Sequence, residues 1–194
     1  MNLRADLQLL YDWIPAKAHV LDLGCSSGEL LHALMNNKQV TGYGVEIDSE
    51  KVIMAINSGV NVIQGNLEHG LPTFDTQSFD VVVLSQTIQA MQQTEAILLE
   101  MLRVGKQALV TFPNFGYWKN RIQIMQGHMP VSDDMPYDWY NTPNIHWCML
   151  GDFEHLCSKN NIPVLERTVM TDGKRINFMP NLLGSLAFYR VGKA

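Results

Sequence analysis

Residues 20–30 read Val20-Leu21-Asp22-Leu23-Gly24-Cys25-Ser26-Ser27-Gly28-Glu29-Leu30, an apolar run that leads through a glycine-containing turn into a helical pattern. Small residues at such a turn let the backbone approach a ligand closely, and the first turn of the helix offers free N–H groups. A dinucleotide-binding Gly-x-Gly-x-x-Gly loop would need its third glycine at Glu29, so this loop is of another kind. The stretch therefore predicts a ligand-binding turn at the end of a first strand.

Strand and helix patterns alternate on both sides of this turn. Short apolar runs predict strands, and apolar residues three and four positions apart predict helices. We expect strands at 19–23, 40–47, 60–64, 79–84 and 107–112, and helices at 3–14, 28–36, 49–59 and 94–104, with Ser49 as the cap of the third helix. This alternation predicts an α/β fold with a mostly parallel sheet and helices on both faces.

The alternation stops after Phe112. Residues 114–150 show no clean period, and a helix at 152–159 and strands at 164–169 and 186–191 follow. We expect these late elements to close the sheet, with an antiparallel last strand. The length of 194 residues predicts one domain over 1–194, with an insertion at about 113–150.

Composition excludes several classes of protein. The chain is 46% hydrophobic with a net charge of −5, so disorder is excluded, and it has no cluster of Lys and Arg for nucleic acid. Its apolar runs are too short to cross a membrane, and its first residues lack the pattern of a signal peptide. Three cysteines imply no disulfide framework, and we expect a cytoplasmic protein. The charged fraction, 17%, is low, which favours a surface that meets a partner.

The residues expected to bind a ligand share one place, the carboxyl ends of the predicted strands. Glu46 ends the second strand, where an acidic side chain can accept hydrogen bonds from both ribose hydroxyls. Each residue alone has a simpler interpretation, as part of a tight turn or a solvated strand end. Their order along the chain nevertheless favours a nucleoside site made by Asp22, Gly24, Cys25, Ser26, Gly28, Glu46, Ile47, Asn66, Leu67 and Ser85.

The glycine turn resembles motif I of class I S-adenosylmethionine-dependent methyltransferases, Gly-x-Gly-x-Gly after an acidic residue, with Ser26 in place of the middle glycine. The resemblance implies a Rossmann-like methyltransferase fold and S-adenosylmethionine or S-adenosylhomocysteine as the bound molecule. It also implies that Asp22 serves the methionine end and that Asn66 stands where such proteins often carry an acidic residue for the adenine amino group. Ser26 and Asn66 depart from the pattern and are expected to weaken binding.

No motif for catalysis or metal binding accompanies this site. The fourth strand continues into Ser85-Gln86-Thr87-Ile88-Gln89, not the Asn/Asp-Pro-Pro-Tyr of amino-group methyltransferases, and no Pro-Cys pair or Gly-x-Ser-x-Gly elbow occurs. Catalytic residues therefore stay unassigned. His146-x-Cys148 and His155-x-Cys157 have residue types that suit zinc, but side chains two positions apart on a helix point away from each other. We expect no metal.

The segment from Phe112 to Leu150 is rich in aromatic residues and poor in charge. It carries only five charged residues, and its aromatic side chains are of the kinds favoured at the centres of interfaces. The segment either caps the sheet or forms a lid and a contact surface, and composition leaves both interpretations open. The expected partner-binding residues are Tyr117, Trp118, Tyr137, Trp139 and Tyr140.

Longer motifs resemble the MetW family of methionine biosynthesis proteins. They are Gly44-Val45-Glu46-Ile47-Asp48, Asn61-Val62-Ile63-Gln64-Gly65, Ser85-Gln86-Thr87-Ile88-Gln89, Glu100-Met101-Leu102-Arg103-Val104-Gly105, Phe112-Pro113-Asn114-Phe115-Gly116, Met129-Pro130-Val131 and Pro136-Tyr137-x-Trp139-Tyr140-x-Thr142-Pro143-Asn144-Ile145-His146. The resemblance implies a protein that partners and supports or activates homoserine O-acyltransferase. The alternative function is methyl transfer from S-adenosylmethionine to a small-molecule or protein acceptor.

Overall fold

The computed structural model describes residues 3–192, which divide into two compact units. One unit contains residues 3–85 and 93–109, and the other contains residues 86–92 and 110–192. The predicted nucleoside site lies entirely in the first unit, and the aromatic segment lies entirely in the second.

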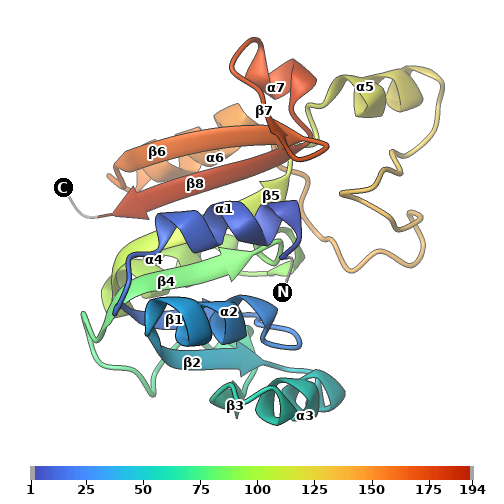
Figure 1. The fold of residues 1–194 in the computed structure, drawn as a ribbon. Coiled ribbons are helices and arrows are strands. Elements are labelled where there is room, and N and C mark those ends of the chain that lie inside the picture. The colour runs from blue at the N-terminus through green and yellow to red at the C-terminus, as the bar shows by residue number, and fades with distance from the viewer. Residues whose placement is uncertain (1–2, 193–194) are drawn as a thin grey trace. The chain divides into compact units, whose positions relative to one another are not determined.

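The first unit contains the strand order β3-β2-β1-β4-β5. Strand β1 (His19–Leu23) pairs in parallel with β2 (Thr41–Glu46) and with β4 (Phe79–Ser85), and β2 pairs in parallel with β3 (Val62–Gln64). Strand β5 (Gly105–Pro113) begins in this unit. Helices α1 (Ala5–Trp13) and α2 (Glu29–Lys38) lie in front of the strands in Figure 1, α4 (Thr94–Val104) lies behind β4, and α3 (Ser49–Asn57) packs beside β3.

Apolar burial explains the central place of β1 and β4. Val20, Leu21 and Leu23 of β1 and the run from Val81 to Leu84 of β4 are buried, which is the pattern of parallel strands covered on both faces. The cap of α3 differs from the prediction. Asp48, not Ser49, precedes the helix in extended conformation, and its carboxylate accepts hydrogen bonds from the N–H groups of Glu50 and Lys51. A carboxylate one position earlier reaches the free N–H groups of the first turn.

The second unit contains the order β5-β8-β6-β7. Strand β6 (Val164–Thr171) pairs antiparallel with β8 (Leu186–Gly192) and with β7 (Lys174–Arg175), so the predicted α/β fold with an antiparallel last strand is confirmed. Helix α6 (Leu150–Lys159) and the short α7 (Pro180–Leu183) belong to this unit. The rings of Phe112, Phe153 and Tyr189 form its core, with centroids 4.6–5.7 Å apart.

The stretch at 114–150, which shows no clean period in the sequence, contains a helix that was not predicted, α5 (Trp118–Met125). The buried side chain of α5 is the polar Asn120, whereas Ile122, Ile124 and Met125 are exposed. Helical periodicity detects an apolar face turned toward a core, and this helix has no such face. Within residues 3–192, no helix combines the length and the apolar character that crossing a membrane requires.

Candidate functional site

The strand ends of the first unit meet at one edge of the sheet. Leu23 is level with Val45 of β2 and with Leu84 of β4, so the next residues along each chain, Gly24, Glu46 and Ser85, follow at the same edge. Glu46 is in turn level with Gln64, and β3 runs on toward Asn66. The parallel register therefore collects the residues that the sequence predicted, at the edge where α/β sheets bind ligands.

Successive N–H groups fasten the glycine turn to the end of β2. Those of Gly24 and Cys25 both donate to the carbonyl oxygen of Val45, at 2.8 and 3.1 Å. The N–H of Ser26 donates to Oε2 of Glu46 at 2.9 Å. Ser26 adopts a φ of +51°, a left-handed conformation that costs a residue with a side chain about 1–2 kcal/mol. The turn is thus held in one conformation by β2 and by a carboxylate.

Gly44 makes room for this arrangement, and sequence analysis did not single it out as a site residue. A Cβ atom at Gly44 would collide with Sγ of Cys25 and lie 2.9 Å from its Cβ. The signal was available, because a glycine inside a strand often marks close approach of another segment. Burial, together with the nearby carboxylates of Asp22 and Glu46, raises the pKa of Cys25 to about 12. Cys25 therefore packs against β2 as a buried, neutral thiol, which disfavours reaction as a nucleophile.

Asp22 is a buried carboxylate without a hydrogen bond. Its side chain is 4% exposed, and none of the residues in 3–192 donates a hydrogen bond to its carboxylate. Burial, and then the charge of Glu46, raises its pKa to about 7. A buried acceptor in this state is expected to gain from a ligand that brings a donor or a positive charge.

Glu46 is also buried, but its carboxylate is already engaged. Oε1 accepts the N–H groups of Ile47 and Asp48 at 2.9 and 3.0 Å, and Oε2 accepts that of Ser26. A carboxylate has about four lone-pair positions, so one position on Oε2 stays open. Glu46 can therefore hold one further hydroxyl donor.

The remaining predicted residues complete the edge. Asn66 uses its Oδ1 to accept the N–H of Glu68 at 3.0 Å, at the start of a short 3-10 turn, η1 (Leu67–His69). Leu67 is buried, whereas Ile47 is 61% exposed and offers an apolar surface. Together these residues fit a nucleoside, since they provide polar acceptors, an apolar surface and, at Asp22, a partner for an amino group.

The family model described as "Methionine biosynthesis protein MetW" matches residues 4–191. The chain belongs to the MetW family. A bifunctional methionine biosynthesis protein MetXA/MetW from Rhodopirellula baltica is 35% identical over 208 residues, which cover 98% of this chain and 33% of the relative. The chain thus spans about a third of the length of that MetW relative.

Solved structures with the same fold include several S-adenosylmethionine-dependent methyltransferases. The protein from Thermotoga maritima, a possible histamine N-methyltransferase, has a TM-score of 0.71 and 19% identity and covers 98% of this chain and 88% of its own. That from Mesorhizobium loti has a TM-score of 0.73 and 12% identity over 98% of both chains. That from Archaeoglobus fulgidus has a TM-score of 0.73 and 13% identity, over 97% of this chain and 92% of its own. At these identities, the likeness shows that this MetW-family chain has the class I methyltransferase fold.

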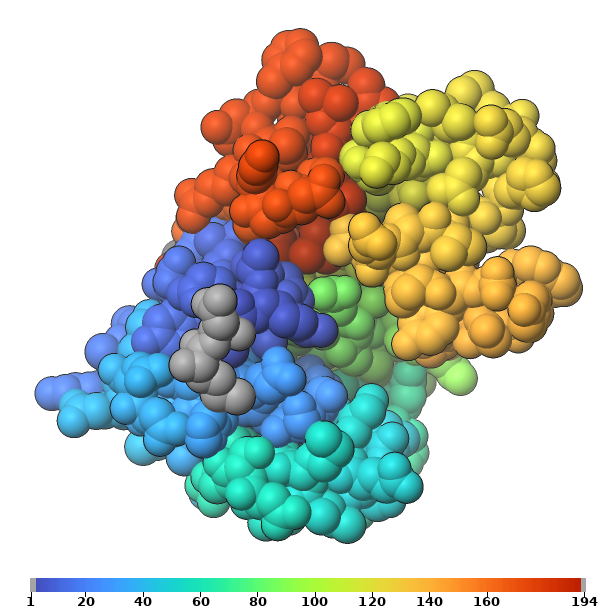
Figure 2. Space-filling view, turned by 45° about the vertical axis from the view of Figure 1, so that its right-hand side comes forward, coloured from blue at the N-terminus to red at the C-terminus, as the bar shows by residue number. Residues whose placement is uncertain are grey.

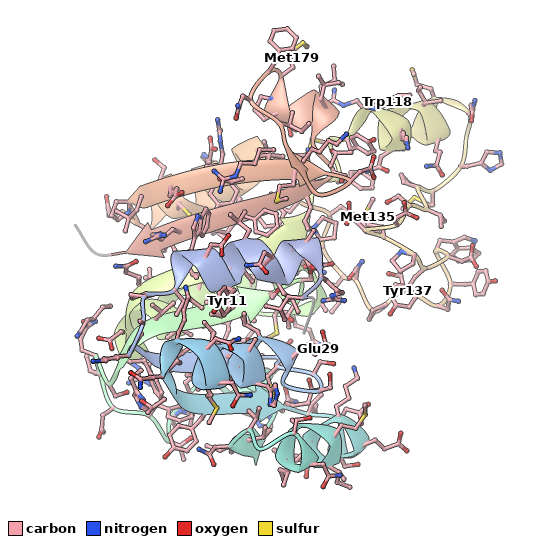
Figure 3. The ribbon with its side chains drawn as sticks, in the orientation of Figure 1. Tyr11, Glu29, Trp118, Met135, Tyr137 and Met179 are labelled. Carbon is pink, nitrogen blue, oxygen red and sulfur yellow. The ribbon has the colours of Figure 1, made fainter. Side chains whose placement is uncertain are left out.

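The aromatic segment forms an exposed surface of the second unit. Figure 2 shows this segment, coloured yellow to orange, on the surface, and Figure 3 shows Tyr137 on its loop and Trp118 at the start of α5. Trp139 and Tyr140 are more than two-thirds exposed, and Tyr140 donates a hydrogen bond to Asp138. Tyr117 differs from the others, because it is only 5% exposed and so contributes little to this surface. Whether the segment also acts as a lid stays a prediction.

The described cysteine and histidine side chains of the second unit do not form a metal site. Within residues 3–192, no three side chains of His, Cys, Asp or Glu come together in a way that could hold an ion. Burial raises the pKa of Cys148 to about 12 and that of Cys157 to about 11, so both thiols are neutral near pH 7.

Proposed function

We propose that this MetW-family chain binds an S-adenosylmethionine-type nucleoside and supports homoserine O-acyltransferase in methionine biosynthesis. The observation that carries the nucleoside part is the pair of buried carboxylates, Asp22 and Glu46, at the edge where the glycine turn meets β2. The partner part is supported by the relative from Rhodopirellula baltica, whose name joins MetW to MetXA in one chain. We take the MetXA part to correspond to the acyltransferase.

Four residues of the edge have proposed roles. Asp22 pairs with the amino group of the methionine end, since no residue in the described range 3–192 donates a hydrogen bond to it. The open position of Glu46 accepts a ribose hydroxyl, and exposed Ile47 packs against the base, with Asn66 near the adenine amino group. Bound S-adenosylmethionine would bring a transferable methyl group, but a role in support of a partner needs only binding and orientation.

Exposed aromatic residues of the second unit are the proposed contact surface. Trp118, Tyr137, Trp139 and Tyr140 are exposed and lie in a segment that carries little charge. Aromatic side chains give large apolar contact area at low cost in side-chain entropy, which makes them frequent hot spots.

Calorimetry with S-adenosylhomocysteine and S-adenosylmethionine tests the nucleoside part. We expect binding to the wild-type chain and about tenfold weaker binding to Glu46→Gln, since a charged acceptor becomes a neutral one. No binding at millimolar ligand would refute it. A methyltransferase assay with the acyltransferase present distinguishes the alternative, since methyl incorporation would make the chain an enzyme.

Co-purification with homoserine O-acyltransferase tests the partner part. Trp139→Ala and Tyr140→Ala are expected to weaken the complex by about tenfold or more each. The matched control is Tyr43→Ala, an exposed tyrosine of the first unit, which should leave the complex intact. Absence of a complex with the wild-type chain, with acyltransferase activity unchanged by its addition, contradicts the proposal.

A further inference from the structure

The acceptor capacity of Glu46 leaves one ribose hydroxyl without a carboxylate partner. A carboxylate holds two vicinal hydroxyls best when each of its oxygens accepts a hydrogen bond from one hydroxyl. In Glu46, however, the N–H groups of Ile47 and Asp48 occupy both lone-pair positions of Oε1. Oε2 has one open position because it accepts only Ser26 N–H at 2.9 Å. The second hydroxyl of a bound ribose therefore needs another partner in the protein.

Ser26 carries a hydroxyl in the right place for this. Its side chain is exposed, and no other residue within 3–192 forms a hydrogen bond with its Oγ. Its own N–H is bound to Oε2 of Glu46, and Oγ is only three bonds from that nitrogen, through Cα and Cβ. The hydroxyl of Ser26 and Oε2 of Glu46 are therefore close neighbours in the turn.

The conformation of Ser26 adds a second argument. Its φ of +51° is a region that glycine adopts freely and serine does not, so the side chain strains the turn. Since the hydroxyl gains no hydrogen bond inside the described protein, the strain is not offset there. Strained residues of this kind concentrate where a ligand makes use of them.

We propose that Ser26 is a specificity-determining residue for the nucleoside: its hydroxyl binds one ribose hydroxyl while Oε2 of Glu46 binds the other. This inference rests on the proposed nucleoside binding. A serine hydroxyl both donates and accepts, so it pairs with a ribose hydroxyl in either orientation. The contact through Ser26 is neutral and the contact through Glu46 is charged, so the two ribose hydroxyls contribute unequally.

Calorimetry with deoxyribose forms of the ligand tests the assignment. The probes are S-adenosylhomocysteine and its 2′-deoxy and 3′-deoxy analogues, each titrated into wild-type, Ser26→Ala, Ser26→Gly and Ser27→Ala proteins. For the wild-type chain, we expect the analogue that lacks the hydroxyl bound by Ser26 to bind about 2- to 10-fold more weakly than S-adenosylhomocysteine. The analogue that lacks the hydroxyl bound by Glu46 should lose more affinity, because that contact is charged. For Ser26→Ala, S-adenosylhomocysteine should bind about 2- to 10-fold more weakly than it binds to the wild type. The analogue that lacks the hydroxyl bound by Ser26 should bind this variant as well as it binds the wild type.

The other variants separate the hydroxyl from the backbone. Ser26→Gly removes the strain together with the hydroxyl, so a binding loss equal to that of Ser26→Ala assigns the effect to the hydroxyl. Ser27→Ala removes the neighbouring hydroxyl of the same turn and should retain the wild-type pattern. The assignment is overturned, while nucleoside binding stands, if Ser26→Ala binds S-adenosylhomocysteine as tightly as the wild type does. It is also overturned if both deoxy analogues lose as much affinity relative to S-adenosylhomocysteine in Ser26→Ala as in the wild type. If the wild-type chain binds none of the probes, the proposed function fails with it.

Discussion

Asp22 and Glu46 are buried carboxylates on neighbouring strands, and the charge of Glu46 adds to burial in raising the pKa of Asp22 to about 7. Two carboxyl groups are thus buried on neighbouring strands, and none of the residues in 3–192 donates a hydrogen bond to Asp22. This is costly for folding and favourable for a ligand that carries positive charge.

Asp22→Asn is expected to stabilise the protein above neutral pH. Because the pKa of Asp22 is about 7 in the folded protein and about 3.8 when unfolded, its contribution is most favourable below about pH 4 and is lost as the pH rises through 7. The stability of the variant relative to wild type should therefore increase across this window, by about 1–3 kcal/mol. Denaturant unfolding at several pH values measures it. Asp172→Asn, at an exposed position, serves as control, and equal pH profiles for Asp22→Asn and wild type would refute the prediction.

Binding of S-adenosylmethionine or S-adenosylhomocysteine should become tighter as the pH rises through 7. The ligand amino group pairs with the ionised form of Asp22, so binding at lower pH must first release a proton. We expect up to about tenfold tighter binding between slightly acid and slightly alkaline solution. Calorimetry in two buffers of different ionisation enthalpy detects the released proton directly. Asp22→Asn should abolish the proton release, and an unchanged release in this variant would place the titrating group elsewhere.

Arg103→Lys is expected to loosen the loop before β4. Arg103 donates to both carboxylate oxygens of Glu100, at 2.7 and 2.9 Å, and to the carbonyl oxygens of Leu71 and Phe74. A lysine cannot reproduce this planar set of donors, so we expect a loss of about 1–2 kcal/mol and faster proteolysis of the loop. Lys106→Ala, which removes an exposed ion pair with Asp80, should change stability by less than about 1 kcal/mol. Equal losses in the two variants would show that Arg103 acts only as a surface charge.

Asn114→Ala is expected to destabilise the second unit more than a change at an exposed asparagine of the same unit. The fully buried amide of Asn114 donates to the carbonyl oxygens of Asn181 and Gly184, at 3.0 and 2.7 Å, and accepts the N–H of Gly116. Alanine leaves all three groups without this partner, for a loss of about 2–4 kcal/mol of unfolding free energy. Thermal and denaturant unfolding measure it, with Asn141→Ala, at an exposed position, as control. A loss below that of the control would show that these groups find other partners.

The order of strands and helices was predictable because its signal is apolar periodicity. Buried β1 and β4 are continuous apolar runs, and they appear so in the sequence. Helix α5 was not predictable by the same means, since Asn120 is its buried residue and its isoleucines are exposed. The cap of α3 was misplaced by one residue, because Asp48 and Ser49 are both good capping residues and only backbone geometry distinguishes them.

The candidate site was predictable in position but not in its hydrogen bonding. Parallel register places successive strand ends at one edge, so Asp22, Glu46 and Asn66 could be grouped from the sequence. That Glu46 has one open lone-pair position depends on where the N–H groups of Ser26, Ile47 and Asp48 point. Those directions follow from backbone dihedral angles. The left-handed φ of Ser26 cannot be predicted from the residue type, because serine rarely adopts it.

The packing of Cys25 into the space left by Gly44 makes the thiol a chemical reporter of the turn. An alkylating reagent cannot reach a sulfur enclosed between the turn and β2, so the thiol reacts only when the turn lifts from the strand. With Cys148 and Cys157 replaced by serine, the labelling rate of Cys25 would measure how often the turn opens. A bound nucleoside that holds the turn against β2 would lower this labelling rate.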